Sequence, residues 1–294
     1  MSYQVQLHKA AKWLVSIRNK DKGWGLSEGQ ASSIVNTAEA IYVLTKASPT
    51  DYHLAITEGL DFIQSKTIDS ANKMPRTRYV FFALLACLEH LEKVNSNFIQ
   101  DCKQWLLKAR NNDGAWGHTA NDENSKLYPT VMALLMLDLF CSEDELATAY
   151  NWIKSKSIDG NGWRFSGDVH YSPIATALAV IALRKVTDSD DHIFVWPKEQ
   201  LLTVSTWDVE TEDMPGTPWV HCSYMWIFPS LTQLGVEPYS KTIAQGVREL
   251  NKLNCDNGWK EPNRHLTVRG QFWATFALHN LKQAYDPAIH TYRI

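Results

Sequence analysis

Helical segments of two kinds alternate along the chain. Segments of the first kind, such as 99–108, place apolar residues on one face only, which is typical of a helix at a protein surface. Segments of the second kind are apolar nearly all round, as buried helices are, and they begin at Ser32, Arg76, Tyr128, Ser172, Thr217 and Val268. No strand signal of comparable strength occurs in the sequence. The pattern predicts helical hairpins, each with an outer amphipathic helix followed by an inner buried helix.

A polar turn follows several of the outer helices, and a tryptophan stands just beyond it. In the clearest copy, WLLKARNNDGAWG, the helix holding Trp105 breaks at an Asn-Asn-Asp-Gly turn, and Trp116 follows. Three copies have two tryptophans eleven residues apart: Trp13 and Trp24, Trp105 and Trp116, Trp152 and Trp163. We expect the second tryptophan of each copy to pack back on the helix that precedes it.

Three weaker copies extend the repeat over the whole chain. DFIQSKTIDSANK carries Lys73 where the tryptophan would stand, and CDNGW ends at Trp259 without the first aromatic residue. Trp207 lies eleven residues after Trp196, although Pro197 is expected to break a helix at that point. Six units of about 49 residues fill the chain. Because neither end has a polar capping unit, closure is favoured over an open solenoid, and we predict an all-α, single-domain (α/α)6 toroid over residues 1–294.

The composition of the chain limits which partners and which cellular compartment are expected. With 294 residues, of which 45% are hydrophobic, the chain can bury a substantial core. The net charge of -3 provides no global attraction to nucleic acid. The N-terminus lacks the layout of a secretory signal, and no apolar run approaches the ~20 residues of a membrane span. Five singly scattered cysteines favour a reducing compartment, so we expect a cytoplasmic protein; peripheral membrane contact is left open.

The tryptophan turn resembles the repeat shared by class II terpene cyclases of the squalene-hopene type and protein prenyltransferase β-subunits. The similarity covers the whole chain as six units and is strongest in the three tryptophan-pair copies. It implies an α/α toroid whose central cavity opens where the inner helices begin. One departure is that Arg18 and Arg110 stand where the family often has glutamine before the turn.

In class II cyclases, the middle carboxylate of an Asp-x-Asp-Asp motif at an inner-helix start protonates an alkene or epoxide. Asp188 to Asp191 spell this motif but follow an inner helix, so we expect a solvated turn there. At an inner-helix start, 219–222 stand in the motif's four positions, and His221 takes the place of the acid. The candidate catalytic residues are His221 and the acidic loop before it, Asp208, Glu210, Glu212 and Asp213.

Resemblance to the prenyltransferases implies a zinc site, but the sequence carries only one of its three ligands. Cys222 matches the thiolate ligand in Cys-Ser-Tyr-Met-Trp, whereas Val220 replaces the aspartate and Arg269 falls near the histidine. One ligand of three cannot hold zinc tightly. We therefore expect no metal and no cofactor; a Mg²⁺ ion accompanying a diphosphate is not indicated.

The inner-helix starts supply candidate substrate-binding residues. Aromatic faces can stabilise a carbocation, and guanidinium groups match an anionic head group such as diphosphate. The candidates are Arg76, Arg78, Tyr79, Tyr128, Tyr171, Trp219, Cys222, Tyr224, Arg269 and Phe272. Each ring could equally pack the interior, and each arginine could lie at the surface. Glu39, Glu89 and Asp138 lie within apolar inner helices and must be paired or face polar surroundings; Asp138 is the best secondary candidate for an acid.

Two hypotheses follow. The first is an isoprenoid-handling enzyme, a divergent class II-like terpene cyclase that protonates a prenyl substrate in a central aromatic cavity. The second is a non-catalytic toroid that binds a lipid, a small anion or a protein partner, for which lost catalytic residues are expected. Cavity depth and turnover of isoprenoids distinguish them.

Overall fold

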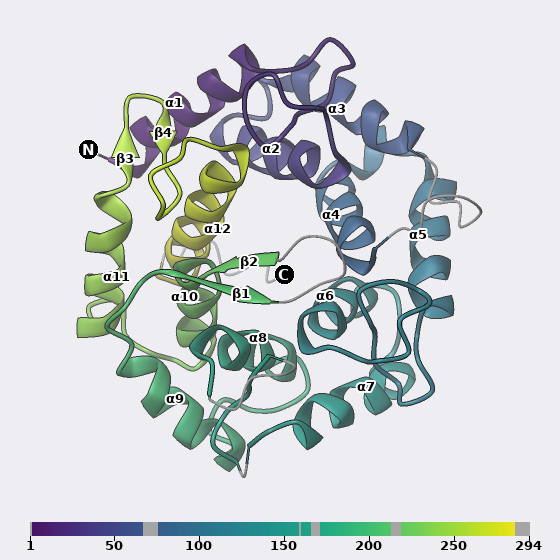
Figure 1. Cartoon of the computed structure of the whole chain (residues 1–294), viewed down its shortest axis with the longest axis vertical. Coiled ribbons are helices and arrows are strands. Elements are labelled where there is room, and N and C mark those ends of the chain that lie inside the picture. Colours follow the sequence, from purple (N-terminus) through teal and green to yellow (C-terminus); the bar gives the residue numbers. More distant parts are fainter. Residues whose placement is uncertain (1, 67–75, 159, 166–170, 213–218, 286–294) are drawn as a thin grey trace. The chain divides into compact units, whose positions relative to one another are not determined.

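The computed structural model describes residues 2–66, 76–158, 160–165, 171–212 and 219–285, and Figure 1 shows the arrangement of its elements. The odd-numbered α-helices are α1 (Tyr3–Ser16), α3 (His53–Ser65), α5 (Ser96–Lys108), α7 (Glu143–Ser155), α9 (Val195–Leu202) and α11 (Lys241–Asn251). The even-numbered ones are α2 (Ile34–Ala47), α4 (Thr77–Leu88), α6 (Leu127–Leu137), α8 (Pro173–Leu183), α10 (Ser223–Gln233) and α12 (Val268–Tyr285). Short 3-10 helices cover Leu91–Lys93 and His192–Phe194.

The alternation of helix types predicted from the sequence is confirmed. Every residue of α8 except Pro173 is buried, whereas α7 buries only Leu146, Ala149, Tyr150, Trp152 and Ile153. The same contrast separates α6 from α5. A helix that is buried all round has few positions where a polar side chain meets solvent, which explains the largely apolar composition of the even-numbered helices.

The structure divides into two compact units. Unit 1 contains the described residues of 1–110, 116–123 and 253–275, and unit 2 contains those of 111–115, 124–252 and 276–294. In unit 1, α2 packs against α1, α3 and α4, and the ring of Phe272 meets Tyr42 and Phe82 edge-on at 5.3 and 5.6 Å between centroids. In unit 2, α8 packs against α6, α7, α9 and α10. The expectation of a single domain stays a prediction.

Each tryptophan beyond a turn ties two helices together. The indole Nε1 atoms of Trp24, Trp116 and Trp163 donate to the carbonyl oxygens of residues ten positions earlier, Leu14, Leu106 and Ile153, at 2.7, 2.7 and 2.8 Å. All three rings are fully buried. In two copies the tryptophan backbone also donates to the following inner helix, from Trp24 N to Thr37 Oγ1 and from Trp163 N to Thr176 Oγ1. The predicted packing on the preceding helix is confirmed.

The two arginines that stand in place of glutamine lie against these same tryptophans. The guanidinium carbon of Arg18 is 5.5 Å from the centroid of the Trp24 ring, and that of Arg110 is 5.4 Å from Trp116. A guanidinium over an indole face is attracted by the ring quadrupole. At these two turns, an arginine in cation–π contact with the tryptophan stands where the resembling family often has a glutamine.

Two features differ from the prediction. Residues 219–222 were expected to open an inner helix, but Trp219–Cys222 form strand β2, paired antiparallel with β1 (Val209–Glu212), and α10 begins only at Ser223. A second short hairpin joins β3 (Asn254–Cys255) and β4 (Gly258–Trp259). Pro197 does not break its helix, because it lies in the first turn of α9, where a backbone N–H has no intrahelical acceptor.

Candidate functional site

The β1–β2 hairpin holds the candidate acids in register within unit 2, and both strands are visible in Figure 1. Glu210 pairs with His221 and Glu212 with Trp219. Because side chains alternate along a strand, these four residues lie on one face of the hairpin. The hairpin leads directly into α10, and the backbone N–H of Ser223 donates to the carbonyl oxygen of Asp208 at 3.0 Å. Helix and hairpin are thereby joined at the point where the acidic strand begins.

His221 and Glu212 form a buried dyad. The Nε2 atom of His221 lies 3.2 Å from Oε2 of Glu212, and the two side chains are 0% and 2% exposed. A carboxylate oxygen only accepts hydrogen bonds, so Nε2 of the imidazole carries a proton in this contact. A buried imidazole held by a carboxylate has the arrangement of a general acid or base.

Aromatic rings enclose the imidazole of His221. Phe165 stacks on it with centroids 4.7 Å apart and an interplanar angle of 11°. Tyr128 meets it edge-on at 4.6 Å, and Trp219 does so at 6.3 Å. Tyr128 also contacts Trp226 on α10 at 6.4 Å. These rings fix the plane of the imidazole and present π faces that attract a positive charge.

The other two described acids, Glu210 on β1 and Asp208 just before it, accept hydrogen bonds from neighbouring groups. The carboxylate of Glu210 accepts a short hydrogen bond from Ser172 Oγ and lies 3.5 Å from the backbone nitrogen of Ile174, so it anchors β1 to the start of α8. Asp208 is exposed, and its carboxylate accepts from the backbone N–H of Val209 at 2.9 Å. Asp213 lies outside the described residues. Of the described acids, Glu212 is the one whose carboxylate contacts the imidazole of His221.

Three further predicted residues lie in unit 2: Cys222 and Tyr224 are buried, and Tyr171 is half-buried. Cys222 precedes α10 and is fully buried, and Tyr224 in its first turn is 1% exposed. The ring of Tyr171 meets Trp196 edge-on at 5.3 Å, and burial raises the pKa of its hydroxyl well above the usual value. Phe165 and Trp226 were not predicted as site residues, because nothing local in the sequence places them against His221.

The remaining predicted residues belong to unit 1. Arg76 precedes α4, and its backbone forms an isolated antiparallel β-bridge with Thr119. The guanidinium carbon of Arg78 lies 5.2 Å from the centroid of the Tyr79 ring. Arg269 pairs with Glu261, Nη2 to Oε2 at 2.9 Å. Phe272 belongs to the apolar core described above, and its role as a ligand contact stays a prediction.

The acids within inner helices differ in their partners. Glu89 pairs with Lys46 at 2.5 Å. Asp138 follows the last residue of α6, where it pairs with Lys185 at 3.3 Å and accepts a hydrogen bond from the Tyr150 hydroxyl. Among the described residues, Glu39 is the one of these three without a cationic partner in an ion pair, and burial raises its pKa to about 7. Asp138 stays a predicted secondary acid, and the burial of Glu39 was not foreseen because its surroundings come from helices distant in sequence.

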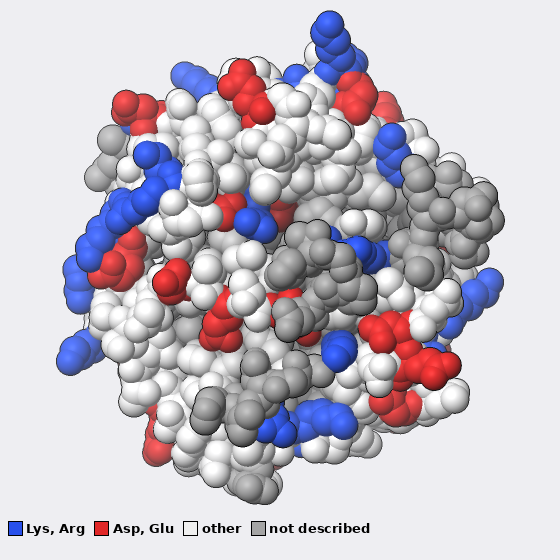
Figure 2. Space-filling view, viewed as in Figure 1, with Lys and Arg blue, Asp and Glu red and all other residues white. Residues whose placement is uncertain are grey.

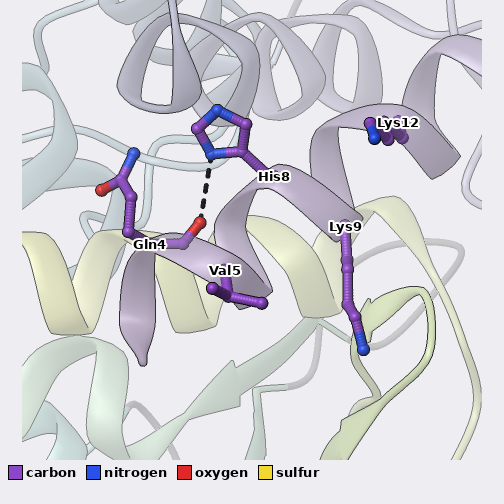
Figure 3. A pocket seen from close by; sticks show the side chains of 5 residues that line it. All are labelled: Gln4, Val5, His8, Lys9 and Lys12. Carbon is purple, nitrogen blue, oxygen red and sulfur yellow. Dashed lines mark hydrogen bonds between the residues drawn. The ribbon is translucent and has the colours of Figure 1, made fainter. Parts of the chain in front are cut away.

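Two other features carry no candidate chemistry. Asp188 and Asp190 lie exposed in the turn after α8, and Asp191 caps a 3-10 helix by accepting from Ile193 N at 2.9 Å, as expected for a solvated turn. A surface hollow of about 400 Å³ opens on α1, lined by Gln4, Val5, His8, Lys9 and Lys12 (Figure 3). It holds no predicted site residue.

Charge and metal-binding groups are dispersed over the described residues. Figure 2 shows basic and acidic side chains interspersed on the face in view. Within the described ranges, no cluster of three or more histidine, cysteine, aspartate or glutamate side chains could hold a metal ion. No helix in that part of the chain has the length and apolarity needed to cross a membrane.

Comparisons with known proteins identify the fold. No protein-family model matches the sequence, and no curated protein matches it. The structure is similar to the type II terpene cyclase MstE from Scytonema, with a TM-score of 0.66 and 12% identity over 96% of this chain and 99% of that one. A variant of MstE bound to geranylgeranyl dihydroxybenzoate matches with a TM-score of 0.64, 12% identity and 96% and 97% coverage.

A second class of enzyme has the same fold. An α-1,6-mannanase from Salegentibacter matches with a TM-score of 0.67 and 10% identity over 96% of this chain and all of that one. At such identities the likeness shows the fold and not the activity. The predicted fold class is thus confirmed: this all-α chain has the α/α-toroid fold found in a type II terpene cyclase and in a mannanase.

Proposed function

We propose that the chain is an isoprenoid-handling enzyme, a divergent class II-like terpene cyclase in which His221 is the proton donor. The observation that carries the proposal is the buried His221–Glu212 dyad enclosed by Phe165, Tyr128 and Trp219. The fold likeness to a cyclase that binds a geranylgeranyl substrate supports it. A small-molecule isoprenoid or lipid is therefore the proposed ligand.

The proposed chemistry uses one proton. The imidazolium of His221 transfers it to the substrate, the carboxylate of Glu212 stabilises the charged imidazolium beforehand, and the resulting carbocation lies among aromatic faces. Cyclisation ends when a base takes a proton from the cation, so substrate and product are isomers. An imidazolium is a weaker acid than a carboxylic acid, which favours an epoxide or a polarised alkene over an unactivated one.

The mannanase neighbour provides the main enzymatic competitor. A glycosidase uses two carboxyl groups flanking the scissile bond, and Glu210 and Glu212 alternate along one face of β1. Glu210, however, is held by the start of α8 and Glu212 by His221. These contacts favour an anchor and an orienting carboxylate over an acid and nucleophile pair.

A substrate panel tests the proposal. The full chain is incubated with prenyl alcohols, their diphosphates, prenylated aromatic acids and the matching terminal epoxides, and with α-1,6-mannotriose, and the products are analysed by mass spectrometry. We expect a cyclic product of unchanged mass from at least one isoprenoid and none from the sugar. Release of mannose would replace the cyclase with a glycosidase, and binding of an isoprenoid without turnover would favour the non-catalytic toroid.

A further inference from the structure

Unit 1 contains a second cluster of polar side chains, at the starts of α2, α4 and α12. Its centre is Glu39, which is fully buried on α2. Asn36 Nδ2 donates to Oε2 of Glu39 at 2.9 Å, and Ser33 Oγ donates to Oδ1 of Asn36 at 2.8 Å. The other carboxyl oxygen, Oε1, has no hydrogen-bond partner among the described residues. A buried polar atom without a partner points to a missing one.

The protonated form of Glu39 is a hydrogen-bond donor at Oε1. Burial raises the pKa of this carboxyl to about 7, against the opposing effects of Asn36, Arg269 and Arg78. Because Oε2 accepts from Asn36, the proton of the neutral acid lies on Oε1. An O–H group left without an acceptor in the interior is destabilising. An oxygen atom of a ligand would remove that cost.

Two arginines, Arg269 and Arg78, act electrostatically on the carboxyl group of Glu39. Arg269 donates from Nε and Nη2 to the two carboxylate oxygens of Glu261, at 3.2 and 2.9 Å. A guanidinium has five N–H groups, so Glu261 leaves some of them for a ligand. Arg78 comes from the first turn of α4. When Glu39 is neutral it offers an O–H donor, and Arg269 offers the N–H groups that Glu261 does not take.

We propose that Glu39, Arg78 and Arg269 form a binding site for an oxyanion group, a carboxylate or a phosphate, and that the anion binds together with one proton on Glu39. The charged groups that act on Glu39 come from α4 and from α12 with the loop before it. α1 and α3 also pack against α2 but, within the described residues, contribute no charged group that acts on Glu39. The site lies wholly in unit 1 and does not depend on the reaction proposed at His221.

The coupling has a definite pH dependence. Below about pH 7 the carboxyl of Glu39 already holds its proton, so anion affinity is independent of pH. Above that pH, binding must take up a proton, and the affinity falls about tenfold for each further pH unit. A site made of the arginines alone would show neither proton uptake nor this slope.

Calorimetric titration of the full chain tests the site. The probes are benzoate for a carboxylate and sulfate for a phosphate, since neither titrates between about pH 6 and about pH 9. Each titration is run in two buffers of different ionisation enthalpy, which reveals proton uptake. We expect at least one probe to bind with close to one proton taken up at about pH 8. The probe that binds more tightly identifies the class of oxyanion.

Variants distinguish the contribution of the proton on Glu39 from that of the positive charge of Arg269. Glu39→Gln keeps the shape and a neutral donor, so it should bind with no proton uptake and no pH slope. Arg269→Lys should weaken binding about tenfold or more at every pH, because the bidentate geometry is lost. Glu89→Gln removes a different, half-buried acid, paired with Lys46, and should change nothing.

Two results would overturn the site: no binding of either probe, or proton uptake that persists in Glu39→Gln. Should that variant fail to fold, infrared difference spectra of the unmodified chain decide the question. Anion binding at about pH 8 must then produce the carbonyl band of a protonated carboxylic acid, and its absence refutes the coupling.

Discussion

The indole Nε1 of Trp116 donates a 2.7 Å hydrogen bond to the carbonyl oxygen of Leu106, near the end of α5. The same bond recurs at Trp24 and Trp163, so the same tryptophan-to-helix hydrogen bond stabilises several of the helix–turn junctions. It satisfies a carbonyl near the C-terminal end of a helix while burying a large apolar ring.

Replacement of Trp116 by phenylalanine should destabilise the protein substantially. The variant loses the bond to Leu106 and leaves a buried carbonyl without its donor, at a cost of about 2–3 kcal/mol in the free energy of unfolding. Trp13→Phe is the control, because Trp13 is only half-buried and should cost less than about 1 kcal/mol. Urea denaturation measures both, and equal costs would show that the corner bond contributes little.

Two glycines of the same turn should respond differently to alanine. Gly160 and Gly162 both have positive φ angles, +77° and +100°, which cost an L-residue about 1–2 kcal/mol. A Cβ atom on Gly162 would also lie 2.8 Å from Thr176 Oγ1, whereas one on Gly160 would meet nothing within 4 Å. We expect Gly162→Ala to cost at least about 2 kcal/mol more than Gly160→Ala in thermal or urea unfolding. A smaller difference would mean that Thr176 can move without loosening its bond to Trp163.

Glu39 should make stability depend on pH in a defined window. Its pKa is about 7 in the folded protein and 4.5 in the reference state, so the folded state binds the proton more tightly. The contribution is fully present below about pH 4.5, is lost as the pH rises to about 7, and then stays constant. The whole change is at most about 3 kcal/mol. In Glu39→Gln the difference from the unmodified chain, measured by urea unfolding at several pH values, should trace this curve; a flat difference would contradict it.

The scaffold could be predicted from the sequence because its signals are local. Trp116 and the turn before it are adjacent in sequence, and the burial of α8 is predicted by its own nearly all-apolar sequence. The strand at 219–222 was missed, since its pairing depends on residues 209–212 across a loop. His221 was nevertheless predicted from the resemblance and Glu212 from its place in the acidic loop before it, but their contact and the stacking of Phe165 depend on tertiary packing. Glu39 was passed over for the same reason, because α4 and α12 determine its environment.

The proton donor is tested most directly by deuterium transfer from solvent. The reaction is run in D₂O with the isoprenoid that the panel identifies, and mass spectrometry measures the deuterium in the cyclic product. The unmodified chain should add one deuterium per product. His192→Asn is the matched control, because His192 also lies beside a carboxylate, 3.0 Å from Asp191, but is exposed in a turn. This variant should leave the rate and the label unchanged. His221→Asn, if it folds as judged by circular dichroism, should form product at least about 100-fold more slowly. A labelled product formed at the normal rate by His221→Asn would contradict the account.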